Sequence, residues 1–291
     1  MEQEINNKLP LLQNAEIDNK VVLLRVDHNV VKKGRIQDPY RIDQTIGTIF
    51  NIVERGGRPI IMTHVGRPRD KETEKIRADQ STTVEPIVQY LRNKLHTNIF
   101  LPEFKAQGEM GIPSIDTSIN HAIKRLKEKE IGAIYLPNAR WFQGEEARSQ
   151  EREDFALQLA GLADVYVNDA FGSWQPHVST YDITKHLPSF AGYLMQQEIN
   201  NLHQVLQPQR PFVAVVAGAK YNTKIGPLNE IYQKVDKLIL GGVIYNTYLC
   251  AKYGISIKGV GESDINAAKD LVEIDRNMEK IVELPFLIES D

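Results

Sequence analysis

Short apolar runs, each flanked by polar residues, recur along the first half of the chain. The first run covers residues 20–26 (KVVLLRV) and is almost continuously apolar. Strands of a parallel sheet look like this, because both of their faces are buried. Further runs of the same kind cover residues 59–63, 99–101, 133–136 and 165–167. The pattern therefore predicts a buried strand in each of these runs.

Segments with apolar residues at helical spacing separate these strands. Residues 43–55 carry apolar side chains every three or four positions, from Ile46 to Val53, and Gly56-Gly57 then ends the helix. Residues 84–95, 118–130 and 151–162 repeat the helical pattern. Strand and helix thus alternate, which predicts an α/β fold with a doubly wound parallel sheet.

The pattern changes after Pro188. Residues 190–206 form one long amphipathic segment, and a proline-containing stretch, residues 207–211, follows it. Alternation then restarts, with strands expected at 212–217, 237–240 and within 280–287, and helices at 225–234 and 244–252. We expect two Rossmann-like domains joined by a bridging helix, the second of them incomplete. The domains would cover residues 1–188 and 207–291, with the interdomain helix at 189–206.

Composition narrows the class of protein. The 291 residues are 42% hydrophobic and 25% charged, with a formal net charge of −3, as in an ordinary soluble protein without a nucleic-acid-binding footprint. One cysteine excludes intrachain disulfides and favours a reducing, cytoplasmic setting. The polar N-terminus is no signal peptide, and the apolar runs are too short to span a membrane. No metal-ligand spacing is found for His28, His96, His121, His186 and His203, and the metal ligands stay unknown.

Polar and basic side chains follow four of the predicted strands where each strand ends. In chain order they are Asp27, Asn29, His64, Arg67, Arg140, Asn168 and Asp169. The carboxyl ends of parallel strands share one edge of a sheet, and ligands of open α/β sheets bind there. Arg67, Arg140, His64 and the nearby Arg41 should therefore converge on one crevice. A small, multiply charged anion is its natural occupant, because guanidinium groups pair bidentately with phosphate and carboxylate.

Each candidate also has a structural alternative. Asp27 and Asn29 could be turn residues that hold local backbone amides. Arg25 is expected to anchor a strand end, and Asp169 to cap the loop after its strand. His28 is expected to be a surface or packing residue. No GxxxxGK[ST] motif exists in the chain, so a P-loop kinase is excluded.

Several ordered motifs give the chain a family resemblance. They are LRVDHNV at 24–30, THVGRP at 63–68, LPNARW at 136–141, VNDAFG at 167–172, AGAKYNTKI at 217–225 and VDKLILGG at 235–242. These resemble LRVDFNV, SHLGRP, LENVRF, VNDAFG, GGAKVxDKI and VDKLIIGG of the phosphoglycerate kinase family. That glycolytic family moves a phosphoryl group between 1,3-bisphosphoglycerate and ADP, so the resemblance implies a kinase of this type.

The resemblance also implies roles for particular residues. The acid substrate would be bound by Asp27, Asn29, Arg41, His64, Arg67 and Arg140. Arg41 and Lys220 would be catalytic, through positive charge on the transferred phosphoryl group. ATP or ADP, which carries its own Mg²⁺, would be bound by Gly218, Lys220, Lys224, Gly241 and Gly242.

Two departures from the family pattern change the expectation. Residues 173–180 (SWQPHVST) replace a loop resembling TAHRAHAST, are one residue shorter and contain no arginine, although His177 keeps the second histidine. The family's later nucleotide-binding loops would lie beyond Asp291.

These departures leave three possibilities. The first is reversible phosphoryl transfer between ATP or ADP and 3-phosphoglycerate or a related acid. The second is a non-catalytic anion-binding paralogue, and the third is a fragment of the kinase without a full ATP site. The incomplete second sheet would leave an open apolar edge, so we expect self-association or poor order in 207–291.

Overall fold

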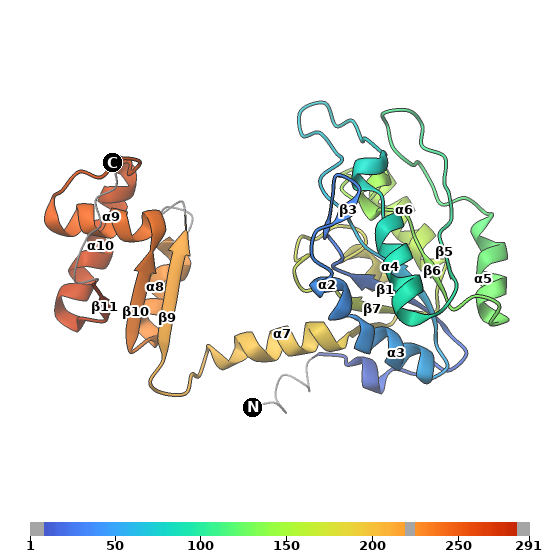
Figure 1. Ribbon diagram of the computed structural model, residues 1–291, viewed down its shortest axis with the longest axis horizontal. Coiled ribbons are helices and arrows are strands. Elements are labelled where there is room, and N and C mark those ends of the chain that lie inside the picture. The colour runs from blue at the N-terminus through green and yellow to red at the C-terminus, as the bar shows by residue number, and fades with distance from the viewer. Residues whose placement is uncertain (1–8, 219–224, 284–291) are drawn as a thin grey trace. The chain divides into compact units, whose positions relative to one another are not determined.

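The computed structural model describes residues 9–218 and 225–283 of the chain. The chain divides into two compact units, Met1–Asn200 and Asn201–Asp291, each with a parallel sheet of its own (Figure 1). The division falls inside helix α7 (Tyr193–Gln204). The finer domain boundaries at residues 188 and 206 stay a prediction.

The first unit contains a six-stranded sheet with the strand order β5-β6-β4-β1-β7-β8. Its strands are β1 (Val21–Val26), β4 (Arg58–Met62), β5 (Ile99–Phe100), β6 (Ala133–Tyr135), β7 (Val165–Asp169) and β8 (Ser189–Ala191). Each neighbouring pair is parallel. The prediction of a parallel α/β sheet is confirmed for this unit.

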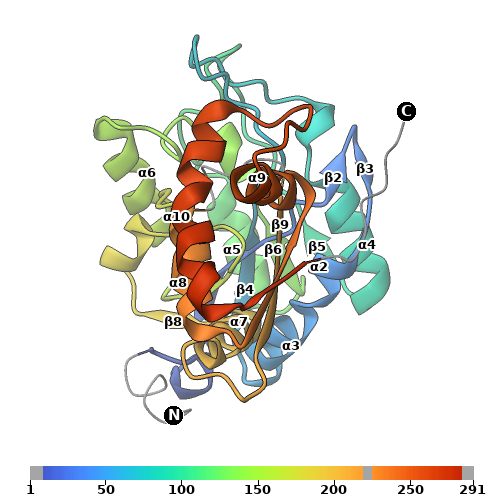
Figure 2. The same cartoon turned by 90° about the vertical axis from the view of Figure 1, so that its left-hand side faces the viewer.

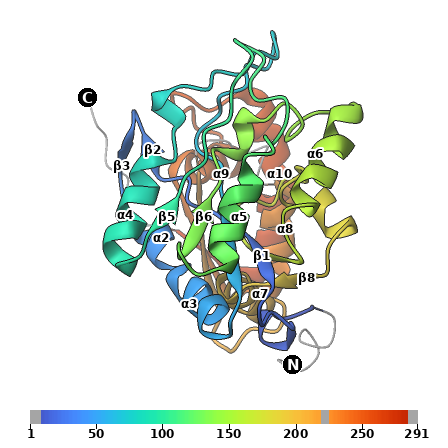
Figure 3. The same ribbon diagram turned by 90° about the vertical axis from the view of Figure 1, so that its right-hand side faces the viewer.

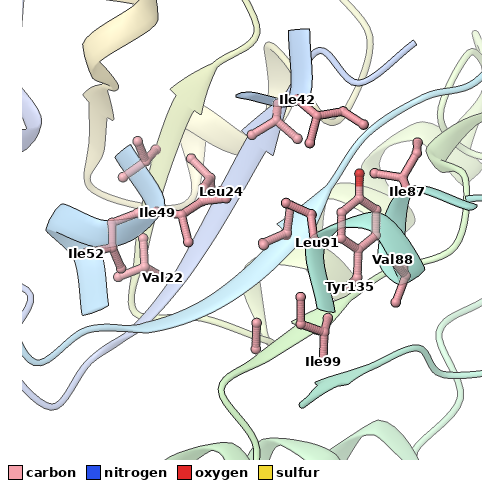
Figure 4. Packing of buried hydrophobic residues seen from close by; sticks show 14 of the residues in the cluster. Val22, Leu24, Ile42, Ile49, Ile52, Ile87, Val88, Leu91, Ile99 and Tyr135 are labelled. Carbon is pink, nitrogen blue, oxygen red and sulfur yellow. The ribbon is translucent and has the colours of Figure 1, made fainter. Parts of the chain in front are cut away.

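Helices cover both faces of this sheet (Figure 3). They are α3 (Ile46–Glu54), α4 (Glu85–Leu95), α5 (Ile119–Lys127) and α6 (Gln150–Ala160). Val22 and Leu24 pack in one core with residues of α3 and α4, as Figure 4 shows. Val21 and Leu23 pack in the other core with residues of α5 and α6. All six residues of β1 are buried for this reason, which accounts for its continuous apolar run.

Shorter elements complete the first unit. They are η1 (Leu12–Asn14), β2 (Val31–Lys32), β3 (Arg35–Ile36), α2 (Tyr40–Asp43), η2 (Gln80–Thr82), η3 (Ala139–Trp141) and η4 (Asp182–Lys185). The prediction of one helix over 43–55 is wrong at its start, because α2 and α3 are separate. Between the two helices, Thr45 N and Thr45 Oγ1 both donate to Ile42 O, at 3.1 and 2.9 Å, as in a turn.

The prediction of a helix over 190–206 is also wrong at its start. Ser189 and Phe190 belong to β8, which pairs with Tyr166 and Val167 of β7. Helix α7 begins only after Gly192, at Tyr193. Sheet pairing over a long sequence separation overrides the local helical pattern here.

The second unit has a three-stranded parallel sheet with the order β11-β10-β9 (Figure 1), and Figure 2 shows its helices α8, α9 and α10. Its elements are β9 (Val213–Gly218), α8 (Ile225–Lys234), β10 (Lys237–Gly241), α9 (Gly242–Tyr253), α10 (Glu262–Met278) and β11 (Ile281–Val282). One face of the sheet packs on all three helices in a single core. On the opposite face Val213, Val215 and Val282 are exposed. Among the described residues, the helices therefore pack on one face of this sheet, and the other face carries these exposed valines.

Helix α10 was missed by the sequence pattern. Its apolar residues at helical spacing, Ala268 and Leu271, are buried, and a buried acidic side chain, Asp275, follows them one turn later. Among the described residues, no helix has both the length and the hydrophobicity that a membrane crossing requires.

Asp275 connects α10, α9, α8 and β11. Its carboxylate accepts from Tyr232 Oη at 2.6 Å and Tyr248 Oη at 3.0 Å, and from Lys280 N and Ile281 N at 2.9 and 3.0 Å. Burial alone would raise the pKa of Asp275, but these hydrogen bonds outweigh it and hold the pKa below its usual value. The second unit therefore depends on an ionised Asp275.

We expect Asp275→Ala to lower the free energy of unfolding of the second unit by about 2–4 kcal/mol, because buried donors lose their acceptor. Urea unfolding followed by circular dichroism measures this change. Asp270→Ala, at an exposed position of the same helix, should change the stability by less than about 0.5 kcal/mol. Because the folded pKa of Asp275 is depressed, its contribution is present above about pH 4 and is lost as the pH falls through the folded pKa. Equal losses for both variants would contradict this role.

Candidate functional site

Neighbouring strands of the six-stranded sheet end side by side at one edge. The register places Arg25 of β1 beside Met62 of β4, and Val26 beside Asp169 of β7. The polar residues that follow β1, β4 and β6 therefore start from this shared edge, where ligands of α/β sheets bind. We refer to Asp27, Asn29, Arg41, His64, Arg67 and Arg140 as the strand-end cluster.

Hydrogen bonds fasten the segment after β1 to the segment after β4. Thr63 Oγ1 donates to Val26 O at 2.9 Å and accepts from His28 N at 2.9 Å. Asn29 Oδ1 accepts from Gly66 N at 2.9 Å. Asn29 therefore holds the turn that carries His64 and Arg67, and its contact with a substrate stays a prediction.

Asn138 was missed as a residue that positions the site. It is fully buried, and its Oδ1 accepts from Val65 N and Arg140 N, each at 3.1 Å. Its Nδ2 donates to Val65 O at 2.8 Å and to Thr82 O at 2.9 Å. One amide side chain thus fixes the backbone beside His64 and the backbone of Arg140 together. An asparagine directly after an apolar strand was the only available signal.

Asp27 and Arg41 are brought together by α2. Arg41 Nη1 lies 3.1 Å from Asp27 Oδ2, and the Arg41 side chain is 56% exposed. Asp27 Oδ1 is buried and has no hydrogen-bond partner among the described residues. A Cβ on Gly172 would lie only 2.4 Å from Asp27 Oδ2, so glycine is needed where this backbone approaches the carboxylate. Asp27 therefore has one buried oxygen without a donor among the described residues, beside the partly exposed cation of Arg41.

A buried chain of polar groups lies behind the cluster. Arg25 Nε donates to Ser179 Oγ at 2.9 Å, and Ser179 Oγ donates to Glu145 Oε1 at 2.6 Å. Ser179 N donates to Glu145 Oε2 at 2.9 Å, and Arg25 Nη1 donates to Val26 O. All three side chains are at most 1% exposed. Burial raises the pKa of Glu145, although Arg25 and Ser179 oppose that rise.

His64 is held neutral by its surroundings. Arg25 Nη2 lies 3.0 Å from His64 Nδ1, and a guanidinium can only donate, so Nδ1 is the acceptor. Burial, together with the charges of Arg25, Arg140, His177 and Arg41, lowers the pKa of His64 to about 2. The proton of the neutral ring is then on Nε2, which is a hydrogen-bond donor at neutral pH.

Arg140 is anchored to the turn after β4, whereas Arg67 is exposed. Arg140 Nη1 donates to Gly66 O at 2.7 Å, and Arg140 Nε lies 3.3 Å from Glu146 Oε1. His177 Nε2 lies 3.5 Å from the same carboxylate oxygen. The structure thus places Arg140 and Arg67 on neighbouring segments, with Glu146 as an unforeseen neighbour of Arg140.

Two polar residues beside the cluster have structural contacts, although Asp169 contacts the start of α7 and not the loop that directly follows its strand. Asp169 Oδ1 accepts from Met195 N at 3.1 Å in the first turn of α7. His28 is fully buried, with Tyr135 Oη 2.9 Å from Nδ1 and Thr45 Oγ1 2.8 Å from Nε2. Since the Thr45 hydroxyl donates elsewhere, it accepts from His28 Nε2, and Tyr135 donates to Nδ1.

The glycines assigned to nucleotide binding lie at two adjacent strand ends of the second unit. Gly218 forms a bridge with Gly242, and Ala217 is paired with Gly241. Gly242 has φ +60°, and a Cβ there would lie 3.1 Å from Gly218 O. The predicted Lys220 and Lys224 lie outside the described residues. Among residues 9–218 and 225–283, no group of three or more acidic, histidine or cysteine side chains could hold a metal ion.

Comparisons with known proteins point to one family. The family model described as Phosphoglycerate kinase matches residues 12–290. The phosphoglycerate kinase of Moorella thermoacetica is 38% identical over 267 residues, which are 90% of this chain and 63% of that protein. That of Pseudothermotoga lettingae is 33% identical over 287 residues, which are 96% of this chain and 66% of that protein. The chain thus spans somewhat less than two thirds of the length of these relatives.

Solved structures agree with the sequence comparison. The structure of phosphoglycerate kinase from Coxiella burnetii matches with a TM-score of 0.73 and 29% identity, over 95% of this chain and 66% of that one. The structure of phosphoglycerate kinase from Pyrococcus horikoshii matches with a TM-score of 0.69, over 94% of this chain and 66% of that one. Its identity of 24% supports the fold alone.

The buried contacts among Arg25, Ser179 and Glu145 predict that losing Arg25 alone destabilises the protein more than losing Arg25 together with the charge of Glu145. We expect Arg25→Met to lower the free energy of unfolding by about 3–5 kcal/mol, because Glu145 loses its buried counter-charge. The double variant Arg25→Met/Glu145→Gln should recover part of that loss, since it leaves no uncompensated carboxylate. Chemical denaturation of the wild type, Arg25→Met, Glu145→Gln and the double variant gives the four free energies of unfolding of a double-mutant cycle. Strictly additive losses would show that the two groups are not coupled through Ser179.

Proposed function

We propose that this chain, which belongs to the phosphoglycerate kinase family, is a phosphotransferase of that type. It would transfer a phosphoryl group reversibly between ATP or ADP and the carboxylate of 3-phosphoglycerate or a related acid. Residues of the first unit would bind the acid, and residues of the second would bind the nucleotide. The family match over residues 12–290 supports the reaction class.

The convergence of the strand-end cluster is the observation that carries this proposal. Arg41, His64 and Arg140 come from separate segments of the chain, and the charges of Arg41 and Arg140 both act on the ring of His64. Phosphoryl transfer requires mainly positioning and positive charge from the protein. An array of guanidinium groups beside a neutral histidine donor supplies both.

The residues of the cluster divide between anchoring and reacting roles. Asn29 and Asn138 hold the backbone, and Arg140 is tied to Gly66 O at 2.7 Å, so Arg140 and Arg67 would hold the end of the acid away from the reaction. Arg41 is more exposed and is held by Asp27, so its guanidinium would reach the transferred phosphoryl group.

The nucleotide would bind in the second unit, where the described residues fit only in part. Gly218, Gly241 and Gly242 leave two strand ends without side chains, so a flat base could approach the backbone. Lys220 and Lys224 would neutralise phosphate charge. When bound, the Mg²⁺-nucleotide supplies the phosphoryl group and the metal charge.

A non-catalytic anion-binding protein is the second candidate. The loop of residues 173–180 contains no arginine or lysine. Titration calorimetry with ADP·Mg²⁺ separates the two candidates. Binding in the micromolar to low millimolar range supports the kinase, and an absence of binding at millimolar nucleotide supports the second candidate.

Arg41 provides the direct test of the kinase. We expect Arg41→Ala to lower kcat about 10²–10³-fold, because one preorganised charge on the transferred group is lost. The kcat of Arg41→Lys should lie between those of the wild type and Arg41→Ala, because lysine keeps the charge without the planar guanidinium group. Arg125→Ala is the control: Arg125 pairs with Glu130 at 3.1 Å on α5, outside the cluster. A coupled assay with ATP and 3-phosphoglycerate measures all four proteins, and a loss below about threefold for Arg41→Ala contradicts the assignment.

We also propose that the chain self-associates through the second unit. Val215, at 69% exposure, pairs with the half-buried Ile239, which pairs with the exposed Val282, so one apolar row crosses all three strands. Exposed apolar patches and sheet edges favour association.

Sedimentation velocity tests this association. The wild type should sediment as a dimer or larger species at tens of micromolar, and Val215→Lys should shift it towards the monomer. Val53→Lys replaces an exposed valine of α3 in the first unit and should leave the distribution unchanged. A wild type that remains monomeric contradicts the proposal.

A further inference from the structure

His28 is a fully buried polar side chain at the point where three segments of the first unit meet. Its backbone N donates to Thr63 Oγ1 at 2.9 Å, in the segment after β4. Its ring lies between Tyr135 of β6 and Thr45, the residue before α3. The motif LRVDFNV has a phenylalanine where residues 24–30 of this chain have a histidine. The ring of His28 therefore makes polar contacts that a phenylalanine could not make.

The hydrogen bonds of the His28 ring run in one direction. Thr45 Oγ1 donates its single proton to Ile42 O at 2.9 Å, so this hydroxyl accepts from His28 Nε2 at 2.8 Å. Nδ1 then carries no proton and accepts from Tyr135 Oη at 2.9 Å. Burial and the nearby charge of Arg25 lower the pKa of His28 to about 3, so the ring is neutral at physiological pH. The result is an unbroken series of hydrogen bonds from the phenol of β6 to the carbonyl of Ile42.

This series ends on α2, the short helix that carries Arg41. Helix α2 has four residues, too few to be stable through its own hydrogen bonds. On one side Ile42 is fully buried, and its carbonyl accepts from both the amide and the hydroxyl of Thr45. On the other side Asp43 accepts from Tyr90 Oη of α4 at 2.8 Å. The backbone of Arg41 is therefore held between the hydrogen bonds of the His28 ring and α4.

The side chain of Arg41 needs this support from its backbone. It is 56% exposed, and its Nη1 pairs with Asp27 Oδ2 at 3.1 Å. Fixing a long arginine side chain costs rotamer entropy, so a single ion pair near the surface holds it only weakly. Asp27 directly precedes His28 in the chain. One residue therefore fixes the position of both members of this ion pair.

We propose that His28 is a positioning residue for Arg41. Through the hydroxyl of Thr45 it holds α2 so that the guanidinium group of Arg41 faces Asp27 and the strand-end cluster. An apolar ring at position 28 would remove the donor to Thr45 and loosen the inner attachment of α2. The effect of His28 on the reaction rate rests on the proposed function, in which Arg41 acts on the transferred phosphoryl group.

Enzyme kinetics with ATP and 3-phosphoglycerate test the inference through Arg41. We expect His28→Phe to lower kcat about tenfold, because a displacement of one ångström can cost about 10²-fold in rate. The KM for 3-phosphoglycerate should change less than about twofold, since Arg140 is anchored by Gly66 and Asn138. In an Arg41→Ala background, the same substitution should change kcat less than about twofold, because no guanidinium group remains to be positioned.

Two further variants address the hydroxyl between His28 and α2. Thr45→Val removes this hydroxyl with little change of shape, so it should lower kcat about as much as His28→Phe does. Thr45→Ser keeps the hydroxyl, and its kcat should stay within about twofold of that of the wild type. Tyr166→Phe is the control, because Tyr166 is 1% exposed and donates to Ser179 O at 2.8 Å. It loses a buried hydrogen bond in the core on the opposite face of the sheet from Ile42, and its kcat should match that of the wild type.

Nuclear magnetic resonance provides a measurement that needs no substrate. The Nε2 proton of His28 should be observed between about pH 5 and pH 8, with Nδ1 unprotonated, because the ring is buried and neutral. The Nε–Hε resonance of Arg41 should shift in His28→Phe and in Thr45→Val. It should not shift in Tyr166→Phe, which leaves the contacts of α2 in place.

The possible outcomes are distinct. A loss of kcat in His28→Phe that disappears in the Arg41→Ala background supports the inference. No loss of kcat, an equal loss in both backgrounds, or an Arg41 resonance that stays unchanged in His28→Phe and Thr45→Val overturns it. A wild type without turnover is instead a failure of the proposed function, and the resonance of Arg41 then decides the inference by itself.

Discussion

A single buried guanidinium, that of Arg25, connects the fold of the first unit to its candidate site. From strand β1 it donates to Ser179 Oγ at 2.9 Å and to His64 Nδ1 at 3.0 Å. Ser179 Oγ in turn donates to Glu145. A buried charge is tolerated only where its donors and counter-charge are supplied. The loop after β7, the turn after β4 and the end of β1 must therefore take up their positions together.

This arrangement determines the protonation state of His64 and which of the other cations can contact a ligand. Because Arg25 donates to Nδ1, the ring stays neutral and presents Nε2 as a donor. Arg41 and Arg140 remain for ligands, and each has a carboxylate beside it, Asp27 and Glu146. Each of these arginines therefore has a neighbouring carboxylate that competes with an incoming anion for its guanidinium group.

Sequence reasoning located the strand-end cluster because two general rules apply to it. A strand buried on both faces is continuously apolar, as β1 is, and parallel strands end at one edge. The same reasoning missed β8 and Asn138, because Ser189–Ala191 and the Asn138 amide are defined by partners far away in the chain. Glu146 was missed for the same reason: a sequence motif names residues but not the partner of each charge.

The candidate acid site is contained within the first unit. The hydrogen bonds and ion pairs that position Asp27, His64 and Arg140 all come from residues before Asn200. The glycines assigned to the nucleotide belong instead to the small sheet, which the described helices cover on one face. Under the proposed function, binding of the acid and transfer of the phosphoryl group would therefore depend on different parts of the chain. Because of this separation, a protein of this kind could retain selective anion binding even where its nucleotide site is weak.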